Sequence, residues 1–159
     1  MASDDERASD FGIVSILKIL LVGCGSIGMR HLRNLKALGV GDLSVCDTIA
    51  EHRERARWEC GARPFSSLES ALATGVDVVF ITTPPHLHLV QAMQVARAGC
   101  HLFVEKPLSN TAEGLDELIE LIRRKNVVSM IGCNMRFHHG PATVKRLLEE
   151  GVVGQITSA

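Results

Sequence analysis

The sequence has no excess of charge of either sign, because 17 lysines and arginines stand against 18 aspartates and glutamates. A chain with this balance has no general attraction for nucleic acid or for an anionic membrane surface. Its one basic cluster alternates with acidic residues, which is typical of a solvated helix face: Arg53, Arg55 and Arg57 with Glu51, Glu54 and Glu59. We therefore expect neither nucleic acid nor a membrane as a partner.

The sequence also lacks paired cysteines. Its cysteines are odd in number, scattered and without any C-x-x-C spacing: Cys24, Cys46, Cys60, Cys100 and Cys133. This pattern favours free thiols in a reducing, cytoplasmic compartment over a disulfide framework. No metal site is expected, because the adjacent His138 and His139 would point apart on extended backbone and no cysteine or carboxylate cluster joins them.

No segment is apolar for long enough to span a membrane. The apolar stretch 13–22 is interrupted by Ser15 and Lys18 and is far shorter than the roughly 20 residues that a spanning helix needs. Residues 1–10 are acidic and polar, unlike the positively charged start of a secretory signal. We expect residues 1–16 to form a disordered tail and the 159-residue chain, which is 46% hydrophobic, to bury one core.

Strand-like and helix-like segments alternate along the rest of the chain. Apolar runs predict strands at 17–22, 43–47, 62–65, 77–82, 101–105 and 127–131. Helices are predicted at 27–38, 49–60, 68–73, 87–98 and 111–125, the last with a capping box of Asn110 and Glu113. Six strands with crossover helices predict an α/β fold of Rossmann type, a doubly wound parallel sheet in the order 3-2-1-4-5-6.

A domain boundary is predicted near Pro141, so that residues 17–140 form the Rossmann domain. Pro141 is suited to the first turn of a helix, which Gly151 would end. Residues 154–159 look like the opening of a new strand. We expect residues 141–159 to be a linking helix and the first elements of a second α/β domain.

The most informative motif is Gly23-Cys24-Gly25-Ser26-Ile27-Gly28, which follows the first strand and opens a helix. Gly23 permits a tight turn, Gly25 lets the backbone approach a pyrophosphate, and Gly28 allows helix and strand to pack closely. Free N–H groups at the helix start would face the anion. Asp47 follows Gly28 by about 20 positions, where a carboxylate accepts hydrogen bonds from an adenosine ribose. The alternative is a tight turn in another kind of α/β domain, which would give these four residues no common purpose.

Asp47 also predicts a preference for NAD over NADP, because a carboxylate at this place repels a 2′-phosphate. Arg53 and Arg55 follow it in the chain and could turn toward such a phosphate. NADP therefore stays open as an alternative cofactor.

Three further segments follow the fourth, fifth and sixth predicted strands: Thr82-Thr83-Pro84-Pro85-His86-Leu87-His88, Glu105-Lys106-Pro107 and Gly132-Cys133-Asn134-Met135-Arg136-Phe137. Together with the glycine motif and Arg30-His31, they make residues 17–159 resemble the Gfo/Idh/MocA family of NAD(P)-dependent oxidoreductases. The Glu-Lys-Pro at the end of the fifth strand is the most specific element. In an open α/β sheet, such strand-end residues converge on one crevice.

The resemblance implies a role for each of these positions. The pyrophosphate of NAD would be held by Gly23, Gly25, Ser26, Ile27 and Gly28, and its ribose by Asp47. The middle of the cofactor would be lined by Thr83, Pro84 and His88, and its nicotinamide ribose by Glu105 and Lys106. Lys106 would also reach the substrate hydroxyl as the catalytic residue, and a sugar-like substrate would contact Asn134 and Arg136.

The resemblance also implies a second α/β domain, which in this family supplies most of the substrate pocket, often with an Asp-x-x-x-His pair, and the oligomer interface. We therefore expect a homo-oligomer only where that domain is present, and no dehydrogenase activity from residues 1–159 alone. Two functions stay open. One is the cofactor domain of an oxidoreductase that moves hydride between NAD(P) and a carbinol carbon of a sugar, cyclitol or nucleotide-sugar; the other is a non-catalytic NAD-binding module or decayed gene fragment. A reading frame that continues into a second sheet would favour the enzyme.

Overall fold

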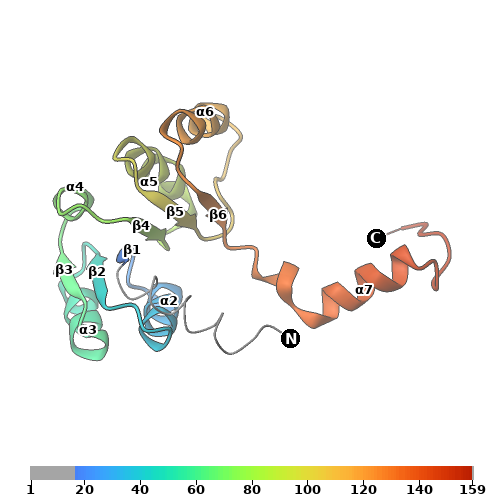
Figure 1. The fold of residues 1–159 in the computed structure, drawn as a ribbon, viewed down its shortest axis with the longest axis horizontal. Helices are drawn as coiled ribbons and strands as arrows, with labels where there is room; N and C mark the ends of the chain where they lie inside the picture. Colours follow the sequence, from blue (N-terminus) through green and yellow to red (C-terminus); the bar gives the residue numbers. More distant parts are fainter. Residues whose placement is uncertain (1–16, 159) are drawn as a thin grey trace, which may run out of the picture.

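A computed structural model describes residues 17–158 and shows one six-stranded sheet (Figure 1). Its strands are β1 (Lys18–Val22), β2 (Asp42–Cys46), β3 (Arg63–Phe65), β4 (Val78–Ile81), β5 (His101–Val104) and β6 (Ser129–Ile131). Every neighbouring pair is parallel, and the order across the sheet is β3-β2-β1-β4-β5-β6. The predicted fold class and strand order are therefore confirmed. The predicted tail, residues 1–16, lies outside the described residues.

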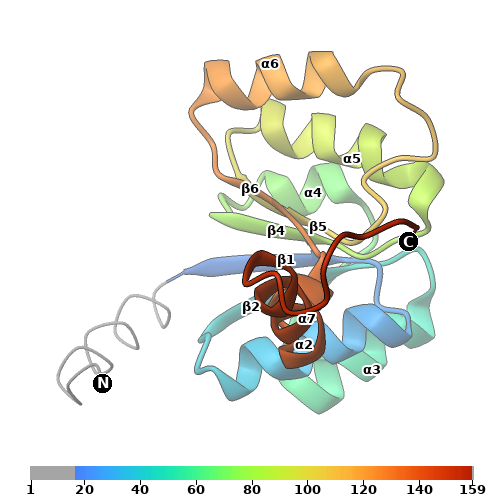
Figure 2. The ribbon, with the colours of Figure 1, turned by 90° about the vertical axis from the view of Figure 1, so that its right-hand side faces the viewer.

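Helices cover both faces of the sheet. They are α2 (Ser26–Ala37), α3 (Ala50–Cys60), α4 (Leu68–Leu72), α5 (Pro85–Arg97), α6 (Leu115–Lys125) and α7 (His139–Glu149), with a 3₁₀ turn η1 (Asn134–Phe137) before α7. Figure 2 shows α2 and α3 on one side of the sheet and α4, α5 and α6 on the other. None of the helices between residues 17 and 158 is long and apolar enough to cross a membrane.

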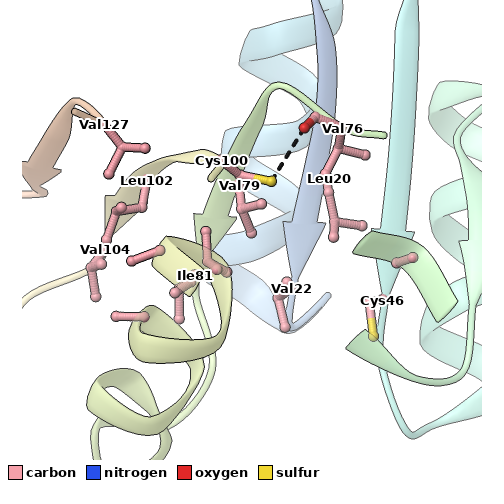
Figure 3. Close-up of a cluster of buried hydrophobic side chains, with 14 of the residues drawn as sticks. Leu20, Val22, Cys46, Val76, Val79, Ile81, Cys100, Leu102, Val104 and Val127 are labelled. Carbon is pink, nitrogen blue, oxygen red and sulfur yellow. Dashed lines mark hydrogen bonds between the residues drawn. The ribbon is translucent and has the colours of Figure 1, made fainter. Parts of the chain in front are cut away.

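The core lies in two layers, one on each face of the sheet, and β1 contributes side chains to both. Ile19 and Leu21 pack into the cluster beneath α2 and α3, which includes Met29 and Leu32. The alternate residues Leu20 and Val22 pack into the opposite cluster, where Figure 3 shows them beside Val79 and Ile81 of β4. This alternation explains why the strand reads as a continuous apolar run, which is typical of a central parallel strand.

Helix α6 begins four residues later than predicted, and the predicted capping box of Asn110 and Glu113 is wrong. The residue before the helix is Gly114, which has a φ of 80° and no side-chain cap. This left-handed backbone interrupts the helical hydrogen bonding that a helix starting at Thr111 would need. A side chain there would also be crowded, since a Cβ at Gly114 would lie 3.1 Å from Cδ2 of Leu89 on α5.

The C-terminal segment forms a helix but not the expected strand. Helix α7 is present and has no buried residue, and Figure 1 shows it standing apart from the sheet and its covering helices. Residues 154–158 have no strand structure, contrary to the prediction. A strand requires a neighbour for its backbone N–H and C=O groups, and the sheet of residues 17–158 ends at β6 on this side.

Candidate functional site

A cleft of about 670 Å³ lies where the strand order reverses, between the carboxyl ends of β1 and β4. We call it the switch-point cleft. Its wall comes from the loops and helix starts that follow the first four strands: Gly23, Gly25, Ser26 and Ile27 after β1, Asp47, Thr48, Ile49 and His52 after β2, Ser66–Leu68 after β3, and Thr82–Pro84, Leu87 and Gln91 after β4. This is the position at which open α/β sheets bind their ligands.

The glycine turn is fixed by close contacts with β4 and β2. Gly23 has a φ of +91°, and a Cβ on it would lie 2.9 Å from the Thr83 backbone nitrogen. A Cβ on Gly28 would overlap the carbonyl oxygen of Gly23. The hydroxyl of Thr82 donates a hydrogen bond of 2.6 Å to that same carbonyl oxygen, and the Gly23 N–H donates one of 2.8 Å to Cys46 O. Gly23 and Gly28 are therefore required by the fold itself.

Gly25 is surrounded differently. It precedes α2 with a φ of −65°, a conformation open to any residue. A Cβ built on it would meet no atom within 4 Å, and the residue lines the cleft. No side chain caps the N-terminus of α2. The first N–H groups of this helix therefore offer hydrogen-bond donors to an anion in the cleft, with open space above Gly25.

Asp47 lies at the tip of β2 and connects it to the glycine turn. Its Oδ1 accepts from the Ile49 N–H at 2.8 Å, and its Oδ2 accepts from the Cys24 N–H at 2.6 Å. The ring of His52 adds a contact of 3.1 Å to Oδ2. Burial by itself would raise the pKa of this carboxyl, but the hydrogen bonds from Ile49, Cys24 and His52 outweigh it and lower the pKa below its usual value. Asp47 is therefore an anion on the cleft wall.

Arg53 and Arg55 do not line the cleft. Arg53 donates to the carbonyl oxygens of Asp47 and Thr48 at 2.8 and 3.1 Å. Arg55 donates to the Cys24 carbonyl oxygen at 3.2 Å. Both guanidinium groups hold the backbone of the loops around the cleft, so the alternative in which they turn toward a 2′-phosphate gains no support from their positions.

Of the three residues expected beside the middle of the cofactor, Thr83 and Pro84 line the cleft and His88 does not. His88 is buried, and its ring nitrogens contact the carbonyl oxygens of Thr83 at 2.6 Å and Pro107 at 2.7 Å. Carbonyl oxygens only accept hydrogen bonds, so both contacts are hydrogen bonds when both ring nitrogens carry a proton. The structure thus places His88 behind the cleft wall, where it links the loops after β4 and β5.

Glu105 and Lys106 follow β5, beside the cleft but outside its lining. Oε1 of Glu105 is 2.7 Å from Nε2 of His31, whose ring contacts Phe103 with its edge at 5.2 Å between centroids. Oε2 of Glu105 accepts from the Lys106 N–H at 3.1 Å. The Lys106 side chain is exposed and makes no hydrogen bond or ion pair within residues 17–158. The glutamate is therefore held in place while the lysine is free to meet a ligand.

Asn134 and Arg136 lie in η1, which follows β6, and both are exposed. The structure brings them to the same edge of the sheet as Lys106, because β5 and β6 are parallel. It does not bring them into the switch-point cleft. No group of histidine, cysteine and carboxylate residues suited to a metal occurs in the described part of the chain.

Sequence reasoning missed the residues that reach the cleft from the sides of helices. His52 comes from the first turn of α3, and Gln91 comes from the second turn of α5, where its Oε1 accepts a hydrogen bond from the Thr83 hydroxyl. Gln91 lies one helical turn after Leu87, which also lines the cleft, so the spacing places the two on one face of α5. Which face meets the cleft depends on packing against the sheet, and His52 had no comparable signal. The partnership of His31 with Glu105 had no local signal.

The doubly wound sheet, the glycine turn and the acidic residue at the switch point together define a nucleotide-binding domain of Rossmann type. Residues 17–133 match the family described as an oxidoreductase family with an NAD-binding Rossmann fold. This match covers well over half of the chain. The protein belongs to the Gfo/Idh/MocA family, as its motifs suggested.

Named relatives agree with this assignment. Levoglucosan dehydrogenase of Pseudarthrobacter phenanthrenivorans is 33% identical over 153 residues, which span 89% of this chain and 39% of that enzyme. The scyllo-inositol 2-dehydrogenase (NAD(+)) of Bacillus subtilis is 29% identical over 145 residues, or 87% of this chain and 42% of that enzyme. The WlbA dehydrogenase from Bordetella pertussis, crystallised with NADH and UDP-GlcNAcA, is 33% identical with a TM-score of 0.80, and the match covers 88% of this chain and 41% of that one. The chain thus spans about two fifths of the length of these relatives.

Proposed function

We propose that the chain binds NAD in the switch-point cleft and forms the cofactor-binding part of an oxidoreductase. The observation that carries this proposal is the surroundings of Gly25. The fold leaves the space above this glycine open, at the uncapped N-terminus of a helix and on the wall of a cleft that also contains an anionic Asp47. Space for a pyrophosphate and an acceptor for a ribose therefore lie side by side.

Different residues of the cleft would contact different parts of the cofactor. The N–H groups of Ser26 and Ile27 would donate to the pyrophosphate, with the positive end of the α2 dipole behind them. Asp47, which stays ionised at neutral pH, would accept from the hydroxyls of the adenosine ribose. Thr83 and Pro84 would form the wall along the middle of the dinucleotide.

The proposed reaction moves hydride between NAD(P) and a carbinol carbon of a substrate. Bound NAD supplies the hydride acceptor at carbon 4 of its nicotinamide ring. As hydride leaves the carbinol carbon, the substrate hydroxyl would lose its proton to a solvent water molecule, and Lys106 would donate to the hydroxyl oxygen and stabilise the negative charge that develops there. Its neighbour Glu105, held by His31, would fix the Glu105–Lys106 segment beside the nicotinamide ribose.

The proposed substrate is a sugar, a cyclitol or a nucleotide-sugar. Asn134 and Arg136 carry hydrogen-bond donors and lie exposed at the strand-end edge of the sheet, as a polyol requires. Support comes from relatives named for levoglucosan and scyllo-inositol, and from one crystallised with UDP-GlcNAcA. The five free thiols of the chain suit a reducing compartment such as the cytoplasm.

A non-catalytic NAD-binding module is the second candidate. The observation that favours it is that Lys106 lies outside the lining of the cleft, so that residues 17–158 do not enclose a reaction site around it. Binding of NAD without turnover by a complete protein would support this candidate against the enzyme.

Calorimetric titration with NAD and with NADP tests the proposed cofactor. We expect NAD to bind more tightly, because the Asp47 carboxylate repels a 2′-phosphate. The Asp47→Ala variant should weaken NAD binding and narrow the difference between the two cofactors. Tighter binding of NADP by the unaltered chain would contradict the proposal.

The role of Lys106 is tested in a version of this protein that extends to the full length of its relatives. The Lys106→Ala variant should lose turnover by on the order of 10² to 10⁴, which is typical of losing a positioned acid–base group. NAD binding and the fold should be retained. Undiminished turnover would remove Lys106 from the mechanism.

A further inference from the structure

His52 is the only imidazole on the wall of the switch-point cleft within residues 17–158. It lies in the first turn of α3, its side chain is about one third exposed, and its Nδ1 is 3.1 Å from Oδ2 of Asp47. A carboxylate only accepts hydrogen bonds, so the Nδ1 nitrogen donates in this contact. The other ring nitrogen, Nε2, makes no hydrogen bond to the described part of the chain. His52 therefore lies beside the Asp47 carboxylate, which is expected to accept hydrogen bonds from the ribose.

The remaining partners of Asp47 cannot change their charge near neutral pH. They are the N–H groups of Cys24 and Ile49. Among the neighbouring elements, the β3–α4 loop contributes only uncharged residues to the cleft, namely Ser66, Ser67 and Leu68. Arg53 and Arg55 on α3 are permanently charged and are engaged with backbone carbonyls, and Glu51, also on α3, is exposed. Asp47 itself stays ionised. The neighbouring thiols of Cys24 and Cys46 stay neutral near pH 7, because burial raises their pKa to about 12 and about 11. The net charge at this end of the cleft therefore changes through His52.

We propose that His52 determines how strongly the cleft discriminates between NAD and NADP, and makes that discrimination depend on pH. The inference rests on the proposed binding of NAD in this cleft. When the imidazole is neutral, Asp47 presents one net negative charge, which repels a 2′-phosphate. When the imidazole is protonated, its positive charge cancels the negative charge of Asp47, and Nε2–H offers a hydrogen-bond donor to the phosphate. Binding of NAD, which has no 2′-phosphate, changes much less.

The sign and size of the effect follow from the charges. An imidazole gains its positive charge as the pH falls, so the affinity for NADP relative to NAD should rise as the pH falls. One unit charge near 4 Å in largely watery surroundings changes an interaction by about 1 kcal/mol. We therefore expect the affinity ratio to change by about fivefold between pH 8 and pH 5.5 through His52.

The experiment measures the dissociation constants of NAD and NADP by calorimetry at pH 5.5, 6.5 and 8. A 2′-phosphate itself takes up a proton near pH 6, so the ratio also needs to be measured in a variant that lacks the imidazole. His52→Gln keeps a polar side chain of similar length that does not titrate. His86→Gln is the matched control, because His86 is an exposed histidine of α5 that does not line the cleft.

The NAD/NADP affinity ratio should change about fivefold more between pH 8 and pH 5.5 in the unaltered chain and in His86→Gln than in His52→Gln. Equal pH dependence in all three proteins would overturn the role of His52 while leaving the proposed function in place. Failure of the unaltered chain to bind either cofactor at any pH would overturn both.

Discussion

The three glycines of the turn after β1 differ in what surrounds them, and so should their substitutions. Gly28→Ala places a Cβ against the Gly23 carbonyl oxygen, which is backbone and cannot move aside without opening the turn. We expect a loss of about 3 kcal/mol in the free energy of unfolding, at the upper end for overpacking. Urea unfolding monitored by circular dichroism measures this loss.

Gly25→Ala is the control for that measurement. Its Cβ meets nothing within 4 Å, so only the weaker helix-capping preference of alanine remains, which is at most about 1 kcal/mol. Equal losses for the two variants would show that the turn is not packed as described.

The five thiols should differ sharply in reactivity. Cys133 is exposed, whereas Cys24, Cys46, Cys60 and Cys100 are buried. Burial, with the nearby Asp47 charge, raises the pKa of Cys24 to about 12 and that of Cys46 to about 11. At pH 8 a disulfide reagent should therefore label one thiol rapidly in the folded chain and all five after denaturation. Cys133→Ser should abolish the rapid phase, and rapid labelling of a second thiol would contradict the burial described.

The same two thiols predict how stability depends on alkaline pH. Their pKa values in the folded chain lie above the ordinary value of 9.0, so their contribution to stability is complete below that pH. It is lost as the pH rises toward 11 and 12, because the unfolded chain ionises first. The free energy of unfolding should fall above pH 9, and less steeply in Cys46→Ala than in the unaltered chain.

At the scale of single elements, α6 ends at a residue with an unusual backbone. Asn126 has a φ of 52° and is the one non-glycine residue with positive φ between residues 17 and 158. Asparagine tolerates this conformation better than alanine does. Asn126→Ala should therefore lower the free energy of unfolding by about 1 kcal/mol, and Asn126→Gly should leave it unchanged or raise it. Equal effects of the two substitutions in urea unfolding would count against the left-handed C-cap.

The elements of the sheet could be predicted from sequence because most strands are short apolar runs, and each is followed by a polar or glycine residue. Five of the six strands begin and end within one residue of the predicted bounds, while β6 begins two residues later than predicted. The start of α6 could not be predicted, because Gly114 adopts a left-handed conformation against Leu89, a contact with a distant helix. The strand expected at 154–158 depended on a partner strand that residues 17–158 do not contain.

The candidate site likewise has residues that the sequence predicts and residues that it does not. The glycine turn, Asp47, Thr83 and Pro84 follow strand ends, so topology alone brings them together. His52 and Gln91 reach the cleft from the sides of helices, and His88 turns away from it. The rotation of a helix about its axis depends on packing against the sheet, which the order of residues does not specify.

At the scale of the whole molecule, the C-terminal segment leaves apolar side chains uncovered. Six large apolar residues from η1 to the end of the described chain are more than half exposed: Met135, Phe137, Val144, Val152, Val153 and Ile156. Exposed apolar surface of this kind promotes association. Residues 1–159 should therefore self-associate as their concentration rises, as measured by light scattering, and Phe137→Ser with Val144→Ser should reduce this. A monomer at all concentrations would contradict this expectation.

The same chain should show no NAD-dependent turnover of sugars or cyclitols. Lys106, Asn134 and Arg136 are exposed on one edge of the sheet, and nothing in residues 17–158 encloses a substrate against them. Holding reactants in near-attack geometry contributes roughly 7–11 kcal/mol to lowering a barrier. A spectrophotometric assay of NADH formation with a substrate panel checks this, and turnover at enzyme-like rates would show that a second domain is not needed.

The central claim is that the switch-point cleft is a dinucleotide site whose open space above Gly25 admits the pyrophosphate. The most direct test is a calorimetric titration of residues 1–159 and of the Gly25→Ala variant with NAD, with thermal unfolding of both to show that the fold is kept. We predict measurable NAD binding by the unaltered chain and at least about tenfold weaker binding by the variant, a loss of about 1.4 kcal/mol or more. Equal affinities in two equally folded proteins, or no binding of NAD by the unaltered chain, would contradict the claim.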